Sequence, residues 1–146
     1  MGKIGDILRS KGSVVHVIEA TATVFQAIRK MVDKNVGSLL VVEKGEIRGI
    51  ITERDYLRRI ILEGRTSKET QVREIMNAKV ICVDSGADIE ESMAVMTSQR
   101  LRHLPVVDSG RLAGLVSIGD LVKYISGERK AEVQYLTDYI TGKYPA

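Results

Sequence analysis

The chain has 146 residues, of which 44% are hydrophobic and 28% charged, and its formal net charge is +3. This composition is ordinary for a soluble globular protein of about one domain's length. The basic excess is small and evenly spread, which excludes the strongly charged class of nucleic-acid-binding proteins but suits a small phosphate-bearing ligand. The sequence has no apolar run of about 18 residues, so we expect no membrane span.

Cys82 is the only cysteine, which rules out an internal disulfide and is typical of a reducing compartment. Residues 1–15 contain no signal-like hydrophobic stretch. We therefore expect a cytoplasmic protein, or one of an organellar matrix if a targeting peptide has been removed. Because Cys82 lies in the apolar run 80–83, we expect a small buried side chain there and not a redox thiol.

The sequence contains an internal repeat. Residues 15–60 align without a gap on residues 80–125, a shift of 65 positions, and residues 4–8 match residues 72–76 when three further positions are allowed. A period of this length is too long for a solenoid unit and predicts two small α/β lobes. We place the first repeat with an N-terminal helix in residues 1–63, a linker in 64–71, the second repeat in 72–126 and a C-terminal helix and tail in 127–146.

The first copy begins with a short helix over residues 4–8, which we expect to join the first lobe. Its further elements follow from hydrophobic period and turn residues. Thr23 is expected to cap the first long helix. The predicted order is a strand over residues 14–18, a helix over 24–32, strands over 39–42 and 47–51, and a second helix from Thr52.

The second copy repeats this order after the polar stretch 64–70, with Asp88 as the expected helix cap. Its strands are predicted over residues 80–83, 104–107 and 112–116, and its second helix begins at Ser117. A lobe of about 60 residues is marginally stable alone, so we expect the copies to pair around a pseudo-twofold axis with two related clefts at the seam. A helix over 130–140 carries an apolar stripe, which we expect to pack on the lobes or on a dimer mate.

One seven-residue motif occurs in both copies. Residues 49–55 read Gly-Ile-Ile-Thr-Glu-Arg-Asp, and residues 114–120 read Gly-Leu-Val-Ser-Ile-Gly-Asp. One interpretation is a capping box, in which the hydroxyl and the carboxylate satisfy the first N–H groups of a helix. The other is a nucleotide site, in which free N–H groups and the hydroxyl bind a phosphate while the carboxylate accepts hydrogen bonds from a ribose.

With its preceding apolar strands, the duplicated motif resembles the CBS domain, and residues 52–56, 64–68 and 102–106 are similar to short stand-alone CBS-pair proteins of bacteria and plant organelles. The resemblance covers about residues 3–126. It implies an α/β fold of two pseudo-symmetric β-α-β-β-α repeats, packed as a tandem Bateman module that forms a homodimer. It also implies adenosine ligands, such as AMP, ADP, ATP or NAD(H), in clefts between the repeats. By position, Asp55 and Asp120 would hold ribose hydroxyls, and Thr52 and Ser117 would bind phosphate.

The copies differ around this motif. Arg54 in the first copy corresponds to Gly119 in the second, and Ser38 corresponds to His103, which follows Arg102. We expect Arg54, Arg102 and His103 to converge at the seam and neutralise phosphates, with Gly119 allowing close backbone approach. A solvated surface charge is the equally weighted alternative for each arginine.

Pro105 has no N–H and cannot occupy a regular central strand. The interruption of the strand's hydrogen bonds would leave backbone N–H and C=O groups free to form hydrogen bonds with the edge of a purine base. Leu39, Leu104 and Val17 would then enclose the base, with ordinary core packing as the alternative for each of them.

Catalysis has little support in the sequence. His16 and His103 are the only histidines, and neither a metal-ligand cluster nor a nucleophile with a base is apparent. We therefore predict a binding module that is not an enzyme and uses no catalytic cofactor or metal. AMP and NAD(H) rank above ATP, because no further basic cluster is apparent for a triphosphate.

Two functions stay open at this point. In the first, the module senses an adenine nucleotide and modulates an unidentified protein target. In the second, it is a nucleotide-independent interaction or dimerisation module. In both cases we expect a homodimer that binds neither membrane nor nucleic acid.

Overall fold

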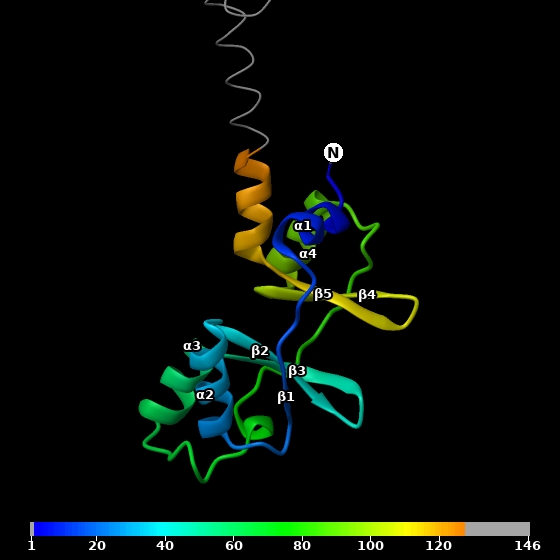
Figure 1. The fold of residues 1–146 in the computed structure, drawn as a ribbon. Helices are drawn as coiled ribbons and strands as arrows, with labels where there is room; N and C mark the ends of the chain where they lie inside the picture. Colours follow the sequence, from blue (N-terminus) through cyan, green and yellow to red (C-terminus); the bar gives the residue numbers. More distant parts are fainter. Residues whose placement is uncertain (1, 128–146) are drawn as a thin grey trace, which may run out of the picture. The chain divides into compact units, whose positions relative to one another are not determined.

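The computed structural model describes residues 2–127, and Figure 1 shows their fold. The helix expected over residues 130–140 lies outside this range. The chain forms two compact units. One consists of Val14–Ile81, and the other combines the chain up to Ser13 with the chain from Cys82 onward. The order of strands and helices confirms the predicted α/β class with two related repeats.

The unit of Val14–Ile81 is built on a three-stranded sheet in the order β1-β2-β3. β1 pairs with β2 in parallel, and β2 pairs with β3 in an antiparallel hairpin. Figure 1 shows α2 and α3 on one side of this sheet. The elements are β1 (Val17–Glu19), α2 (Val24–Lys34), β2 (Ser38–Glu43), β3 (Glu46–Thr52), α3 (Glu53–Tyr56), the π-helical turn η1 (Leu57–Ile61) and the 3₁₀ turn η2 (Val72–Glu74).

Helix α2 begins where the sequence predicts. The Gln26 N–H donates to Thr23 Oγ1 at 3.1 Å, and the Thr23 N–H donates to Gln26 Oε1 at 2.9 Å, which is a reciprocal capping box. The helix ends at Asn35, whose left-handed backbone has φ 54°. Its buried residues recur at helical spacing and form the unit's core with residues of the sheet, η1 and η2. This core consists of Ala20, Val24, Ala27, Met31, Leu39, Val41, Ile51, Ile60, Val72 and Ile75.

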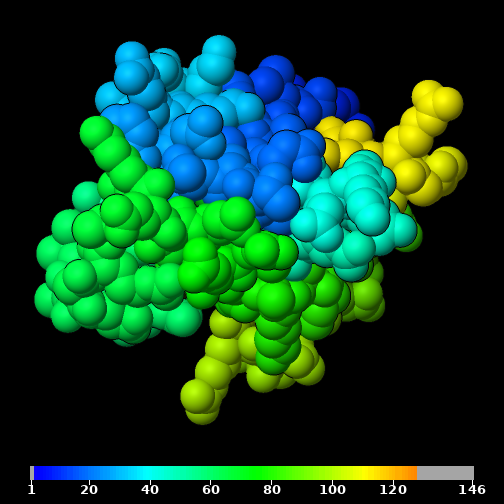
Figure 2. Space-filling model, turned by 90° about the horizontal axis from the view of Figure 1, so that it is seen from below, coloured from blue at the N-terminus to red at the C-terminus, as the bar shows by residue number. Residues whose placement is uncertain are grey.

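The residues predicted to form a linker, 64–71, contact α2 within this unit. The Val24 N–H donates to Thr70 O at 2.8 Å, and the Phe25 N–H donates to Ser67 O at 3.0 Å. The Thr70 side chain is only 3% exposed. In Figure 2 this segment (green) lies directly beside α2 (blue). These polar residues supply carbonyl groups to the first turn of α2, which needs acceptors from outside the helix.

The second unit contains the hairpin β4-β5 with helices on one side of it (Figure 1). Its elements are α1 (Ile4–Lys11), α4 (Ile89–Gln99), β4 (His103–Asp108) and β5 (Arg111–Ser117), and residues 118–127 are helical. Asp88 occupies the predicted cap position of α4, but its side chain makes no capping hydrogen bond and forms an ion pair with Lys3 instead. The buried apolar side chains of this unit include Ile4, Ile7, Leu8, Ile89, Met96, Leu104, Val106, Val116 and Leu121.

Helix α1 does not join the first repeat, as the sequence led us to expect, but packs on the second. The Ile4 N–H donates to Ala87 O at 2.9 Å, and the Gly5 N–H donates to Ser85 O at 2.8 Å. The matching segment of the second copy, which includes Val72 and Ile75, lies in the core of the first repeat's unit. Each repeat therefore packs the segment that precedes the other repeat in the sequence.

The strand predicted over residues 80–83 is reduced to a single parallel bridge between Val83 and Val106. In the first repeat, the Leu40 N–H on β2 donates to His16 O at 3.1 Å and extends the ladder toward β1. The corresponding residue on β4 is Pro105, which has no N–H to donate. Cys82 is exposed, which contradicts the expected burial; alternation beside the bridge turns Val83 inward and Cys82 outward.

Candidate functional site: two strand-to-helix junctions

The first junction is the point where β3 passes into α3. The Thr52 N–H donates to Asp55 Oδ2 at 2.9 Å, and the Asp55 N–H donates to Thr52 Oγ1 at 3.2 Å. The Thr52 hydroxyl also donates to Asp55 Oδ2 at 3.1 Å. These bonds form the capping box that the spacing predicted. Both bonds that the Asp55 carboxylate accepts use Oδ2, so within residues 2–127 its other oxygen keeps its acceptor capacity for a ligand.

The second junction repeats this geometry at the end of β5. The Ser117 N–H donates to Asp120 Oδ2 at 2.8 Å, and the Asp120 N–H donates to Ser117 Oγ at 3.1 Å. One further side chain takes part here. Lys11, at the end of α1, donates from Nζ to Asp120 Oδ2 at 2.6 Å and to Leu115 O at 2.9 Å. The second aspartate is therefore capped on its own helix and paired to a cation from another helix.

The electrostatics of Asp120 follow from these contacts. Partial burial disfavours the charged carboxylate, but the hydrogen bonds from Lys11 and from the Ser117 N–H outweigh it. The net effect holds the pKa of Asp120 below its ordinary value. The carboxylate is thus ionised at neutral pH and suited to accept hydrogen bonds from hydroxyl groups.

The strand residues expected at the site lie beside these junctions. Ser38 on β2 is opposite Thr52 on β3, and His103 on β4 is opposite Ser117 on β5. The polar side of each hairpin end is therefore assembled from both of its strands. The first helical N–H of each junction donates to the backbone just before the first strand of the hairpin, to Gly37 O at 3.0 Å and to Arg102 O at 2.8 Å.

The apolar residues expected to enclose a base are placed differently. Leu39 is 0% exposed and belongs to the core of its unit, and Leu104 is likewise 0% exposed. Both therefore act as packing residues, the alternative that the sequence left open. Val17 on β1 is half-buried. Pro105 is buried and pairs with Leu115 on β5.

The remaining predicted residues divide between the two units. Arg54 is exposed on α3, in the unit of Val14–Ile81. Arg102 and Gly119 are exposed in the other unit, where His103 is half-buried. The convergence of Arg54 with Arg102 and His103 stays a prediction. Arg54 and Gly119 each occupy the second position of a helix, where a backbone N–H has no acceptor one turn earlier.

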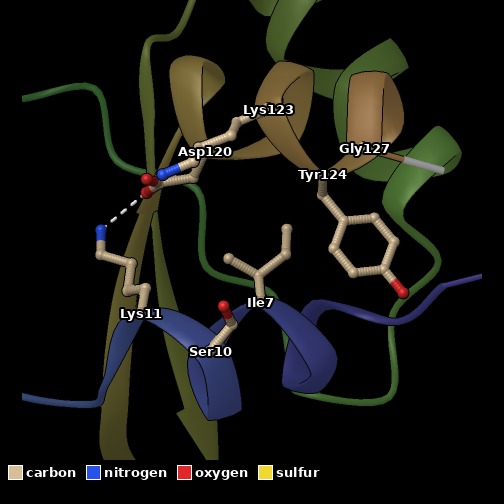
Figure 3. A pocket seen from close by; sticks show the side chains of 7 residues that line it. All are labelled: Ile7, Ser10, Lys11, Asp120, Lys123, Tyr124 and Gly127. Atoms are coloured by element: carbon tan, nitrogen blue, oxygen red, sulfur yellow. Dashed lines mark hydrogen bonds and ion pairs between the residues drawn. The ribbon is translucent and has the colours of Figure 1, made fainter. Parts of the chain in front are cut away.

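A pocket of about 500 Å³ opens beside Asp120. Figure 3 shows its lining, with Lys11 and Lys123 both reaching toward the carboxylate of Asp120. The lining consists of Ile7, Ser10, Lys11, Asp120, Lys123, Tyr124 and Gly127. Sequence reasoning missed Lys11, Ser10 and Ile7, because it assigned α1 to the other repeat. It also missed Lys123, although its position one helical turn after Asp120 was a usable signal.

Among residues 2–127, no three His, Cys, Asp or Glu side chains are grouped closely enough to hold a metal ion. No helix in that part of the chain is long and apolar enough to span a membrane.

Comparisons with known proteins agree with this architecture. The CBS domain family model matches residues 4–62 and 72–127. The chain is 42% identical, over 97% of its own length and 73% of the relative's, to the CBS domain-containing protein CBSX3, mitochondrial, of Arabidopsis thaliana. It is 33% identical, over 78% of its length and 81% of the relative's, to the CBS domain-containing protein YhcV of Bacillus subtilis.

Among solved structures, a putative signal-transduction protein with CBS domains from Burkholderia ambifaria is similar with a TM-score of 0.78 and 46% identity. The match covers 84% of this chain and 93% of that one. The family model thus matches both sequence copies, and the solved structure reproduces their fold. The chain belongs to the CBS domain family and carries two CBS domains in tandem.

Proposed function

We propose that the chain is a non-catalytic regulatory module that binds adenine nucleotides and passes their occupancy to a partner protein. The observation that carries this proposal is the duplicated junction, in which a hydroxyl residue and an aspartate lie at the start of a helix in both repeats. The ligand class is AMP, ADP, ATP or NAD(H). We propose that it acts in a reducing compartment, the cytoplasm or an organellar matrix; the plant relative is named as mitochondrial.

The chemistry of each junction suits this ligand class. A ribose presents two neighbouring hydroxyl donors, and a carboxylate with a remaining acceptor oxygen can receive them. A phosphate is stabilised by the positive end of a helix and by N–H groups that lack intrahelical acceptors. Aspartate and serine or threonine one turn apart thus offer one acceptor for the sugar and one donor for the phosphate. The capping box is compatible with this role, since it uses a single oxygen of Asp55.

Isothermal titration with AMP, ADP, ATP, NAD⁺ and NADH tests the proposal. We expect micromolar binding of at least one ligand, lost from one site in Asp55→Ala and from the other in Asp120→Ala. Thr23→Ala is the matched control, because it removes a capping box from α2 without touching either junction. Absence of binding across the whole panel would refute the proposal, and so would binding whose affinity and stoichiometry neither aspartate substitution changes.

An interaction or dimerisation module is the second candidate, and an exposed apolar surface favours it. We use the name α2/η1 face for the exposed apolar side chains of Val32 on α2, of Leu57 and Ile61 on η1, and of Leu62 directly after η1, with exposures of 73%, 55%, 55% and 80%. Exposed apolar side chains commonly mark an interface where they form a patch. A partner complex that forms equally well with and without nucleotide, and survives Asp55→Ala with Asp120→Ala, would favour this candidate over the sensor.

A further inference from the structure

The pocket beside Asp120 combines two cations with one anion. Lys11 reaches it from the end of α1, and its ammonium group lies 2.6 Å from Asp120 Oδ2. Lys123 lines the same pocket from the helix that carries Asp120. Figure 3 shows the two lysine side chains approaching Asp120 from different elements. Among the lining residues that the structure describes, which end at Gly127, Asp120 is the only acidic residue beside the two lysines.

The rest of the lining has the character of a small-molecule site. Ile7 and the ring of Tyr124 form an apolar wall, and Ser10 adds a hydroxyl group. Ile7 is 4% exposed, so its position is fixed by core packing. A volume of about 500 Å³ falls within the range of about 300 to 1,000 Å³ that is typical of ligand pockets.

The Lys11–Asp120 pair leaves room for a ribose at Asp120. Lys11 and the Ser117 N–H both donate to Asp120 Oδ2, and the ammonium group of Lys11 also donates to Leu115 O. The other carboxylate oxygen of Asp120 can therefore accept from a ribose while Lys11 stays in place. The Lys11 side chain is 39% exposed, so its ammonium group can also donate to a phosphate that enters the pocket.

From this arrangement we infer that the second repeat's site selects adenine nucleotides with more than one phosphate, and that Lys11 and Lys123 are the selecting residues. The inference rests on the proposed function of Asp120. The first phosphate is served by Ser117 and the first turn of the helix. The β- and γ-phosphates of ADP and ATP extend beyond it and offer acceptors to the two ammonium groups. This reverses the ranking of AMP above ATP expected from the sequence.

The test uses Asp55→Ala as the background, so that only the second repeat's site is titrated with AMP, ADP and ATP at one fixed salt concentration. We expect ADP or ATP to bind at least tenfold more tightly than AMP. Lys11→Met combined with Lys123→Met should reduce that preference to less than threefold. AMP affinity should be nearly unchanged, because its single phosphate is served by Ser117 and the first turn of the helix. Lys34→Met, which removes the same charge from the last turn of α2, should leave the preference intact.

Two failures are distinguishable in this design. If AMP binds as tightly as ATP in an Asp120-dependent manner, or if the lysine variants weaken all three nucleotides equally, the selectivity inference is overturned and the proposed function stands. If none of the three nucleotides binds while the protein remains folded, both are overturned. Unfolding curves of the lysine variants decide whether a loss reflects the site or the stability of α1.

Discussion

Gly114 on β5 lies against Leu8 of α1 so closely that a Cβ on the glycine would come within 2.6 Å of Leu8 Cδ2. The first repeat has the matching relationship. A Cβ on Gly49 would lie 2.6 Å from Asn77 O and 2.9 Å from Met76 Sδ. Each glycine of the duplicated motif therefore provides room for the segment that precedes the other repeat. The motif therefore has a glycine at this position because of packing, in addition to any contact that the glycine makes with a ligand.

We predict that the two Gly→Ala substitutions differ in cost. Gly49→Ala meets a backbone carbonyl, which cannot move without disturbing the bridge between Ile50 and Asn77. It should lower the free energy of unfolding by about 2 to 3 kcal/mol, at the upper end of overpacking effects. Gly114→Ala meets the end of a flexible leucine and should cost about 1 kcal/mol. Urea unfolding measures both.

A second substitution separates the two cases. Leu8→Ala should recover part of the loss caused by Gly114→Ala, because it removes the atoms in conflict. Met76→Ala should recover little of the loss in Gly49→Ala, since the carbonyl of Asn77 remains. Equal costs for both glycines, or full recovery of the Gly49→Ala variant by Met76→Ala, would contradict this account.

The pH dependence of stability should contain a contribution from Asp120. The pKa of Asp120 is lower in the folded protein than its ordinary value, with burial opposing the shift and the contacts from Lys11 and Ser117 producing it. Its stabilisation is therefore complete above the unfolded value of about 3.9 and disappears as the pH falls through the lower folded value. Asp120→Asn should cost about 1 kcal/mol at pH 7.

Urea unfolding at pH 7, 5 and 3 measures this contribution. The difference between the wild type and Asp120→Asn should stay constant between pH 7 and 5 and shrink toward pH 3. Asp33→Asn, on the exposed surface of α2, controls for the loss of one negative charge. A difference that grows on acidification would rule out the proposed sign.

Pro105→Ala should restore a donor to β4. The residue in the same position of the first repeat, Leu40, donates its N–H at 3.1 Å to the backbone before β1. With an N–H at position 105, the single bridge at Val83 should extend into a ladder, and the new amide should exchange slowly with solvent. Hydrogen exchange followed by NMR measures this. Leu40→Pro is the converse variant and should destabilise the first repeat by more than 1 kcal/mol. Fast exchange at position 105 would show that the proline is not the cause of the short strand.

The homodimer expected from the family provides a test of the α2/η1 face. Leu62 is 80% exposed and Val32 73% exposed, so a charge at either position should leave the free energy of unfolding of the monomer nearly unchanged. If a second copy covers this face, Leu62→Asp with Val32→Asp should convert a dimer into a monomer in sedimentation velocity experiments. Leu112→Asp, on β5 of the other unit, is the control. A dimer that persists in the double variant would place its interface elsewhere.

The order of strands and helices could be predicted because the spacing of hydrophobic residues and the positions of glycines are local properties of the sequence. Both copies share them. Thr23 capped α2 as expected, and the strands of both hairpins lie within about a residue or two of the predicted bounds. The placement of α1 could not be predicted in this way. Its apolar spacing indicates a buried helix face, but its hydrogen-bond partners Ser85 and Ala87 lie some 80 residues away in the sequence.

The candidate site, too, could be predicted only in part. Both hydroxyl–aspartate junctions were predictable, because the three-residue spacing fixes their geometry at the start of a helix. The contact of Lys11 with Asp120 was not predictable, because the two residues are 109 positions apart in the sequence. For Leu39 the sequence left two roles open, enclosing a base or packing in the core, and its 0% exposure places it in the core. Local sequence does not indicate which of a strand's two faces meets the core.

The exchange of segments also determines how the molecule responds to force. Helix α1 precedes the first repeat in the sequence but is hydrogen-bonded to Ser85 and Ala87 in the unit of the second repeat. Tension applied at the N-terminus would therefore act on the second repeat before it reached β1 of the first. Once Ile4 and Leu8 were withdrawn, the second repeat would lose buried core residues while the first stayed intact. The second repeat would therefore unfold before the first.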